Sequence, residues 1–158
     1  MAKGDIVTIG DWTAIELLAS ATAVNNPPAS LTDGVAVDQI ASAFGGIVPD
    51  DLTLLLVSTA GSATMSCSAR LWMKFATLAG LTSAPGCWAP AGVGTGAAKG
   101  LINAGASIDE TGADMLRHAE PVGLVAHAER VFIEITAIGG TATAVTVFLV
   151  GRRRTGSY

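Results

Sequence analysis

The 158-residue sequence predicts a mainly β domain, an antiparallel β-sandwich. Two long runs of β-branched and aromatic residues lie in the last third of the chain, on either side of a glycine pair. A third run alternates apolar with polar residues along its whole length, as a strand with one buried face does. Shorter strand-like runs with turn signals lie between them. A jelly roll of about eight strands fits the length, and an immunoglobulin-like sandwich is the alternative.

The two runs in the last third are predicted to form a closing hairpin. Val131 to Ile138 (VFIEITAI) and Thr141 to Val150 (TATAVTVFLV) flank Gly139-Gly140, and two glycines suit a two-residue turn with positive φ. In that register one face carries Val131, Ile133, Ile135 and Ala137 with Ala142, Ala144, Thr146 and Phe148, and the other carries Phe132 and Ile138 with Val145, Val147 and Leu149. A hairpin that is apolar on both faces is expected if one face meets the core and the other a neighbouring subunit. We therefore assign Phe132, Val145, Val147 and Leu149 to an interface.

A second hairpin is predicted in the middle of the chain. Leu52 to Ser58 (LTLLLVS) and Ala63 to Phe75 (ATMSCSARLWMKF) flank the turn Thr59-Ala60-Gly61-Ser62. The alternation in the second strand places Trp72 on the polar face, between Arg70 and Lys74. An outward Trp between two cations is typical of an interface anchor or a ligand-stacking platform. The alternative is that Trp72 packs beneath a loop of its own chain.

The other elements are shorter. Their predicted positions are strands at Ile6 to Ile9 and Thr13 to Leu18, broken at Gly10-Asp11; a helix at Val37 to Phe44; a long loop or short strands from Ala84 to Gly105; and a helical turn or strand at Thr111 to Ala119, closed by Pro121. No linker divides the chain, so we expect a single domain. We expect neighbouring subunits to hold its amino-terminal segment (about 1–35) and its basic tail (152–158).

The composition favours a subunit of an assembly. Charged residues make up 14% of the chain, against about 25% in an ordinary soluble domain. A protein free in solution usually keeps more surface charge to resist association, whereas a covered subunit does not need it. The net charge of −4 gives no general field for attracting nucleic acid. Cys67 and Cys87 are predicted to be free, with Cys67 a small core residue.

Ile135 to Gly151 is uncharged and precedes three arginines, which is also the pattern of a membrane span. The stretch is shorter than the roughly 20 residues that a span needs, and it contains the glycine pair and alternating threonines. A β-strand pair explains these features, so no membrane partner is expected. Arg152, Arg153 and Arg154 are assigned to contacts with acids of a neighbour, because the guanidinium group pairs well with carboxylates. A solvated tail or a phosphate contact are the alternatives.

No catalytic or metal site is predicted. His118 and Glu120 would share a face of an extended segment, and His127 and Glu129 repeat the spacing. We interpret both pairs as polar residues leading into the last strands. The glycine-rich stretch from Gly92 to Gly100 lacks phosphate-loop spacing, because Gly100 follows Lys99 where a hydroxyl residue should stand. No cofactor is expected.

The carboxyl half carries a family resemblance in three segments, Gly86-Cys87-Trp88-Ala89-Pro90, Glu129 to Thr136 (ERVFIEIT) and Ala137 to Val145 (AIGGTATAV) running into Val150-Gly151-Arg152. In these it resembles small structural proteins of tailed bacteriophages, including capsid decoration (cement) proteins and jelly-roll fibre or spike domains. The resemblance covers about half the chain and says nothing of residues 1–50. It implies a trimeric or ring-like arrangement that stabilises a DNA-filled shell.

We therefore expect a virion structural protein, a capsid decoration subunit located in the phage particle. Its partners would be copies of itself and a major capsid or other virion protein. One alternative is a carbohydrate-binding or receptor-binding sandwich of a fibre or spike, which would use Trp72 and Trp88. The other is a small cupin-like metal enzyme, which would use His118 and His127.

Overall fold

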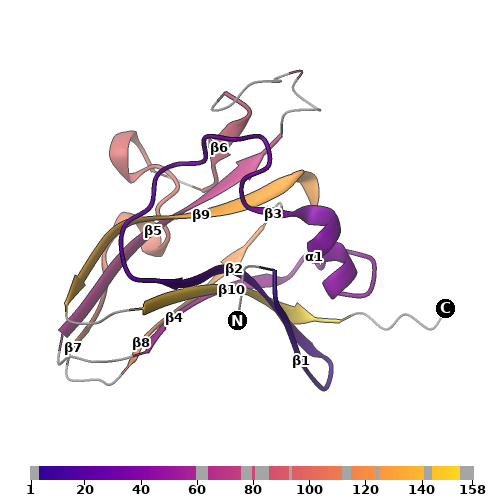
Figure 1. Cartoon of the computed structure of the whole chain (residues 1–158), viewed down its shortest axis with the longest axis horizontal. Helices are drawn as coiled ribbons and strands as arrows, with labels where there is room; N and C mark the ends of the chain where they lie inside the picture. Colours follow the sequence, from indigo (N-terminus) through magenta and orange to yellow (C-terminus); the bar gives the residue numbers. More distant parts are fainter. Residues whose placement is uncertain are drawn as a thin grey trace.

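The computed structural model describes residues 4–59, 64–75, 80, 86–92, 94–111, 115–123, 125–140 and 144–153, and it is a sandwich of two antiparallel sheets (Figure 1). Sheet A has the order β1 (Ile6–Ile9), β2 (Trp12–Ala21), β10 (Ala144–Arg152), β4 (Leu52–Thr59) and β8 (Met115–Val122). Sheet B has the order β3 (Val35–Ala36), β9 (Arg130–Gly140), β5 (Thr64–Lys74) and β6 (Trp88–Pro90), and β7 (Ile108–Thr111) also pairs with β5. The predicted fold class, a mainly β antiparallel sandwich, is confirmed.

The strand pairs are nested along the chain. β2 pairs with β10, β3 with β9, β4 with β8 and β5 with β7, all antiparallel. The chain therefore runs as one long antiparallel ribbon, folded so that successive pairs alternate between sheet A and sheet B.

Both predicted hairpins are wrong, although their strands are present. β4 and β5 lie in different sheets, and so do β9 and β10. Gly139 and Gly140 are the last two residues of β9, in register with Ser66 and Met65 of β5. Because β10 lies between β2 and β4, and β9 between β3 and β5, each strand already has two partners from distant parts of the chain. A hairpin between β9 and β10 would have to replace one of them.

The core consists of the side chains that point inward from the two sheets. Along β10 the burial alternates, and Val145, Val147 and Leu149 are fully buried. The predicted helix is confirmed as α1 (Val37–Ala43), which lies at one end of the sandwich (Figure 1). Phe44, which follows α1, packs so closely beside Gly151 that a Cβ on this glycine would lie 3.1 Å from the ring.

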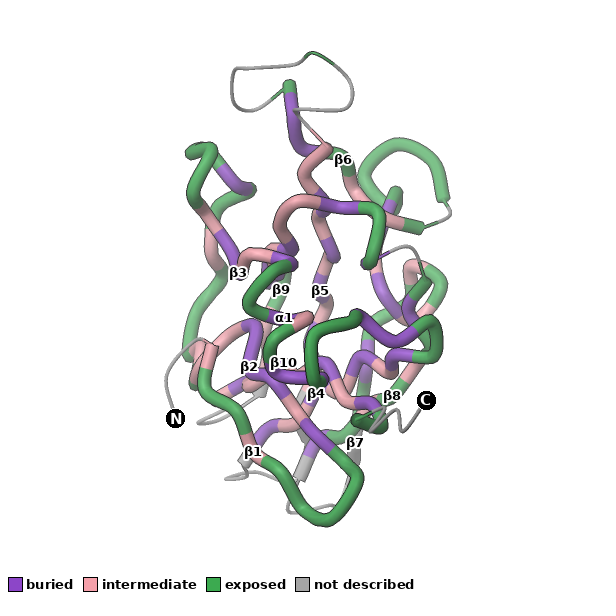
Figure 2. Tube along the Cα trace, turned by 90° about the vertical axis from the view of Figure 1, so that its right-hand side faces the viewer, coloured by how far each residue is buried: buried purple, intermediate pink, exposed green. Residues whose placement is uncertain are grey.

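The amino-terminal strands belong to the domain itself. β1 and β2 meet at Gly10-Asp11 as predicted, with Gly10 at a φ of 60°, and Asn25 donates from its side chain to the carbonyl of Ile133. Sheets A and B thus bind the described part of residues 1–35, and an additional contact of this segment with a neighbour stays a prediction. Figure 2 shows the tip of the β1–β2 hairpin as exposed. Residues 154–158 of the predicted tail lie outside the described residues.

The region from Ala84 to Gly105 contains β6 and the 3-10 helices η1 (Gly96–Ala98) and η2 (Asn103–Gly105). A further 3-10 helix, η3 (Val125–His127), precedes β9. Pro121 lies within β8 rather than closing it, since β8 is at the edge of sheet A and can lack one backbone donor. Within the described ranges, no helix has both the length and the apolar character needed to cross a membrane.

Candidate functional site

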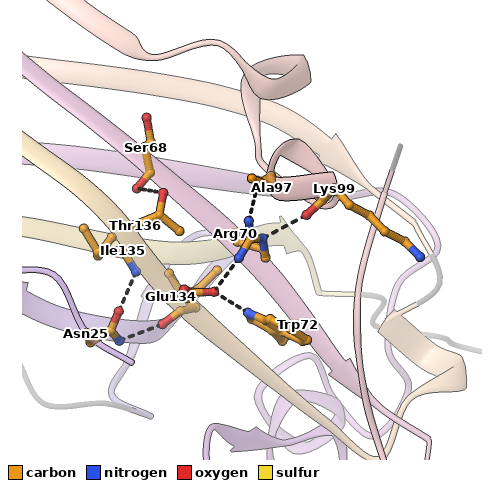
Figure 3. Close-up of polar contacts among 10 residues, drawn as sticks. Asn25, Ser68, Arg70, Trp72, Ala97, Lys99, Glu134, Ile135 and Thr136 are labelled. Carbon is orange, nitrogen blue, oxygen red and sulfur yellow. Dashed lines mark hydrogen bonds and ion pairs between the residues drawn. The ribbon is translucent and has the colours of Figure 1, made fainter. Parts of the chain in front are cut away.

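The outer face of sheet B carries a polar network around Glu134 (Figure 3). The buried Oε2 of Glu134 accepts hydrogen bonds from Trp72 Nε1 at 2.7 Å and from Arg70 Nη1 at 3.1 Å. Arg70 also donates from Nε to the carbonyl of Lys99 at 2.8 Å and from Nη2 to that of Ala97. One guanidinium therefore ties η1 and the residue after it to sheet B. This agrees with the alternative in which Trp72 packs beneath a loop of its own chain.

A second group of contacts covers the same face further along. Trp88 is buried and meets Phe132 edge to face, with ring centroids 6.2 Å apart. Its Nε1 donates to the carbonyl of Ser30 at 3.1 Å, and Arg130 donates to the carbonyls of Thr32, Asp33 and Gly34. Segment 25–34 is thereby fixed against sheet B. Trp72 and Phe132, assigned above to an interface, are partly covered by the chain itself.

The assignment of Val145, Val147 and Leu149 to an interface is wrong. All three are completely buried between the sheets and have no surface to offer to another chain. The error follows from the hairpin register, which placed these residues on the outer side. In the structure they face the core, and the alternate residues of β10 face outward.

The outer side of β10 forms an apolar surface with its neighbour β4. Phe148 lies opposite Leu55, Val150 opposite Thr53 and Thr146 opposite Val57, and all six keep part of their surface exposed. We call these six residues the Phe148 face. The sequence signal for it is the run Leu54-Leu55-Leu56-Val57, since a strand without alternation is covered on both faces.

The β1–β2 hairpin adds further apolar surface at the edge of sheet A. Ile9 is 76% exposed, Trp12 50% and Ile6 49%. Arg152, at the end of β10, lies opposite Trp12 and places its guanidinium 4.9 Å from the centroid of the Trp12 ring. Arg153 donates its backbone N–H to the carbonyl of Asp11. Both arginine side chains are exposed, and their assignment to a contact with a neighbour stays a prediction; Arg154 lies outside the described residues.

Glu16 of β2 lies in register with Phe148. It is 1% exposed, and its Oε1 has no hydrogen-bond partner within the described part of the chain. Burial raises the pKa of this carboxyl group, because loss of hydration disfavours the charged form. A buried acid with one oxygen unpaired among the described residues thus lies at the margin of the Phe148 face.

The predicted common face of His118 and Glu120 is confirmed. His118 Nε2 lies 2.8 Å from Glu120 Oε2, and the same oxygen accepts from the backbone N–H of Asn103 at 2.7 Å. His127 is exposed on η3. No group of three or more His, Cys, Asp or Glu residues suited to a metal ion occurs among the described residues.

Cys67 and Cys87 are both free, as predicted, and Cys87 is buried as well as Cys67. Cys67 lies in the main core, where burial raises the pKa of its thiol to about 11. A thiol with so high a pKa remains protonated at neutral pH and is a poor nucleophile.

Comparison of the chain with protein-family models, with curated proteins and with solved structures finds no match.

Proposed function

We propose that this chain is a structural subunit of a virion, a capsid decoration protein of the bacteriophage type that acts through contacts with other protein chains. The particle type rests on the sequence resemblance. The mode of action rests on the surface of sheet A.

The strand arrangement supports a jelly roll as the finer fold class. In a jelly roll, two Greek keys are formed by one ribbon of paired strands folded over itself. The nested pairs β2 with β10, β3 with β9, β4 with β8 and β5 with β7 have this order. Jelly rolls occur in viral capsid proteins, but also in lectins and cupins, so fold alone does not select the function.

The single observation that carries the proposed mode of action is the Phe148 face. Leu55, Val57, Phe148 and Val150 place apolar side chains on the outer side of two adjacent central strands. An antiparallel sheet with one solvated face normally has polar residues there. Covering this face with a neighbour would remove it from water, at roughly 25 cal/mol per Å² before the entropy of association is subtracted.

The Trp12–Arg152 pair supports the same surface. Trp and Arg, together with Tyr, are the residues enriched at the energetic centres of protein interfaces. Here an exposed Trp and a guanidinium are already stacked at the edge of sheet A, so association would not need to order them first. Copies of the chain in a trimer or ring, together with the capsid protein beneath, are the proposed partners.

The particle assignment can be tested with antibodies against the chain. Virus particles from the source cells would be separated by density-gradient centrifugation and examined by immunogold electron microscopy. We expect the chain to co-sediment with particles and the gold to label their outer surface. Chain that remains in the soluble fractions, with unlabelled particles, would exclude a virion protein.

A further inference from the structure

A cavity of about 490 Å³ lies at the open side of the sandwich, between the edges of the two sheets. Leu71 and Met73 of β5, Pro90 of β6, Ile102, and Val122 of β8 line it. Its volume lies within the range of about 300 to 1,000 Å³ typical of small-molecule sites. Such sites combine an apolar lining with few polar groups that fix the orientation of the ligand.

Glu120 is the only charged residue among the described residues of the lining. It projects from the inner side of β8, since it lies opposite the buried Leu54 of β4. Its Oε2 is held by two contacts, the backbone N–H of Asn103 and Nε2 of His118. Among the described residues, none forms a hydrogen bond or ion pair with Oε1. The carboxylate is therefore fixed in position with one oxygen left to accept a further hydrogen bond.

We propose that this cavity binds a small amphiphilic amine, whose hydrocarbon part lies against Leu71, Met73 and Val122 and whose ammonium group meets Glu120. A carboxylate ligand would place like charges together, and an alcohol would form only a weaker, neutral-donor hydrogen bond. The occupant is thus a cationic amphiphile rather than a fatty acid. This site is separate from the Phe148 face and does not depend on the proposed virion function.

The test compares three probes of equal chain length, n-octylamine, 1-octanol and octanoate, by isothermal titration calorimetry on the full chain. We expect octylamine to bind most tightly, octanol more weakly by roughly tenfold, and octanoate not measurably. Glu120→Gln should lower octylamine affinity to that of octanol and leave octanol unchanged. Asp11→Asn is the matched control, because it removes an exposed carboxylate in the turn between β1 and β2, at the other edge of sheet A from β8, and should change nothing.

Occupation of the cavity itself is tested by Ala91→Phe, which places a ring in the lining and should abolish binding of octylamine and octanol. Circular dichroism checks its fold, and Leu101→Phe replaces it if it does not fold. Absence of binding by every probe to the wild-type chain would overturn the site. Equal affinity for octylamine and octanoate, or an unchanged octylamine affinity in Glu120→Gln, would overturn the proposed ligand class.

Discussion

The outer faces of the two sheets differ in how far other segments of the same chain cover them. On sheet B, Arg70, Trp72 and Glu134 form a hydrogen-bonded network, and segments from elsewhere in the chain pack over it. On sheet A, four of the six residues of the Phe148 face are apolar, and Phe148 and Val150 among them are still partly exposed. The chain covers one face itself and leaves the other as an apolar surface, which is what a subunit that docks through sheet A requires.

The buried acids of the two faces show the same difference. Glu134 on sheet B has two donors on one carboxylate oxygen. Glu16 on sheet A has an oxygen without a partner among the described residues. A buried carboxylate is stable when it is hydrogen-bonded and costs free energy when it is not. The chain itself thus supplies two donors to Glu134, whereas the described residues supply none to Oε1 of Glu16.

The largest effect is expected inside the sandwich, where the two faces share a core. Val147→Asp places a charge among fully buried side chains, where no partner can neutralise it. We expect a loss of more than about 4 kcal/mol in the free energy of unfolding, enough to prevent folding. Circular dichroism and urea titration measure it. A folded, stable variant would mean that β10 presents this side to the exterior.

The second effect tests whether the hydrogen bonds around Glu134 stabilise the loops that pack on sheet B. Glu134→Ala removes the acceptor of both Arg70 and Trp72, leaving two largely buried donors unpaired. We expect a loss of about 3 kcal/mol in the free energy of unfolding. Glu134→Gln is the matched control, because it keeps an acceptor oxygen, and should lose about 1 kcal/mol. Equal and small losses in both variants would show that the network does not hold the loops.

A smaller effect is expected at Glu16, and it depends on pH. Since burial raises the pKa of Glu16 in the folded chain, the folded state binds this proton more tightly than the unfolded state. Stability should therefore fall as pH rises from about 4, the ordinary Glu range. Glu16→Gln should melt about 2–4 °C higher than wild type at neutral pH, and the difference should vanish near pH 4. A difference that is the same at both pH values would contradict an ionisation effect.

The sequence was sufficient to predict strands but not their partners. The alternation around Trp72 and the apolar runs on both sides of Gly139-Gly140 identify β5, β9 and β10, because burial of one or both faces leaves a local pattern. The choice of a partner strand leaves no such pattern in the sequence. β10 alternates in the same way whether its partner is β9 or the distant β2 and β4, so the hairpins were wrong and the two sides of β10 were exchanged.

The same limit applies to the candidate surfaces. The outward direction of Trp72 followed from period two, and the common face of His118 and Glu120 followed from their spacing. The coverage of the outer face of sheet B by other segments of the chain could not be predicted from the sequence. It depends on contacts such as that between Trp88 and Ser30, which are 58 residues apart. The prediction that the last strand is apolar on both faces was correct. Only the structure shows that Phe148 lies on the outer face.

Sedimentation of wild type and Phe148→Asp over a wide concentration range tests whether the Phe148 face is a contact surface between chains. Ala137→Asp is the matched control, because it adds the same charge at an exposed position of sheet B. We expect wild type and Ala137→Asp to self-associate, and Phe148→Asp to sediment as a single chain with a melting temperature close to that of wild type. A wild-type chain that stays single at all concentrations, or a Phe148→Asp variant that associates as wild type does, would contradict it.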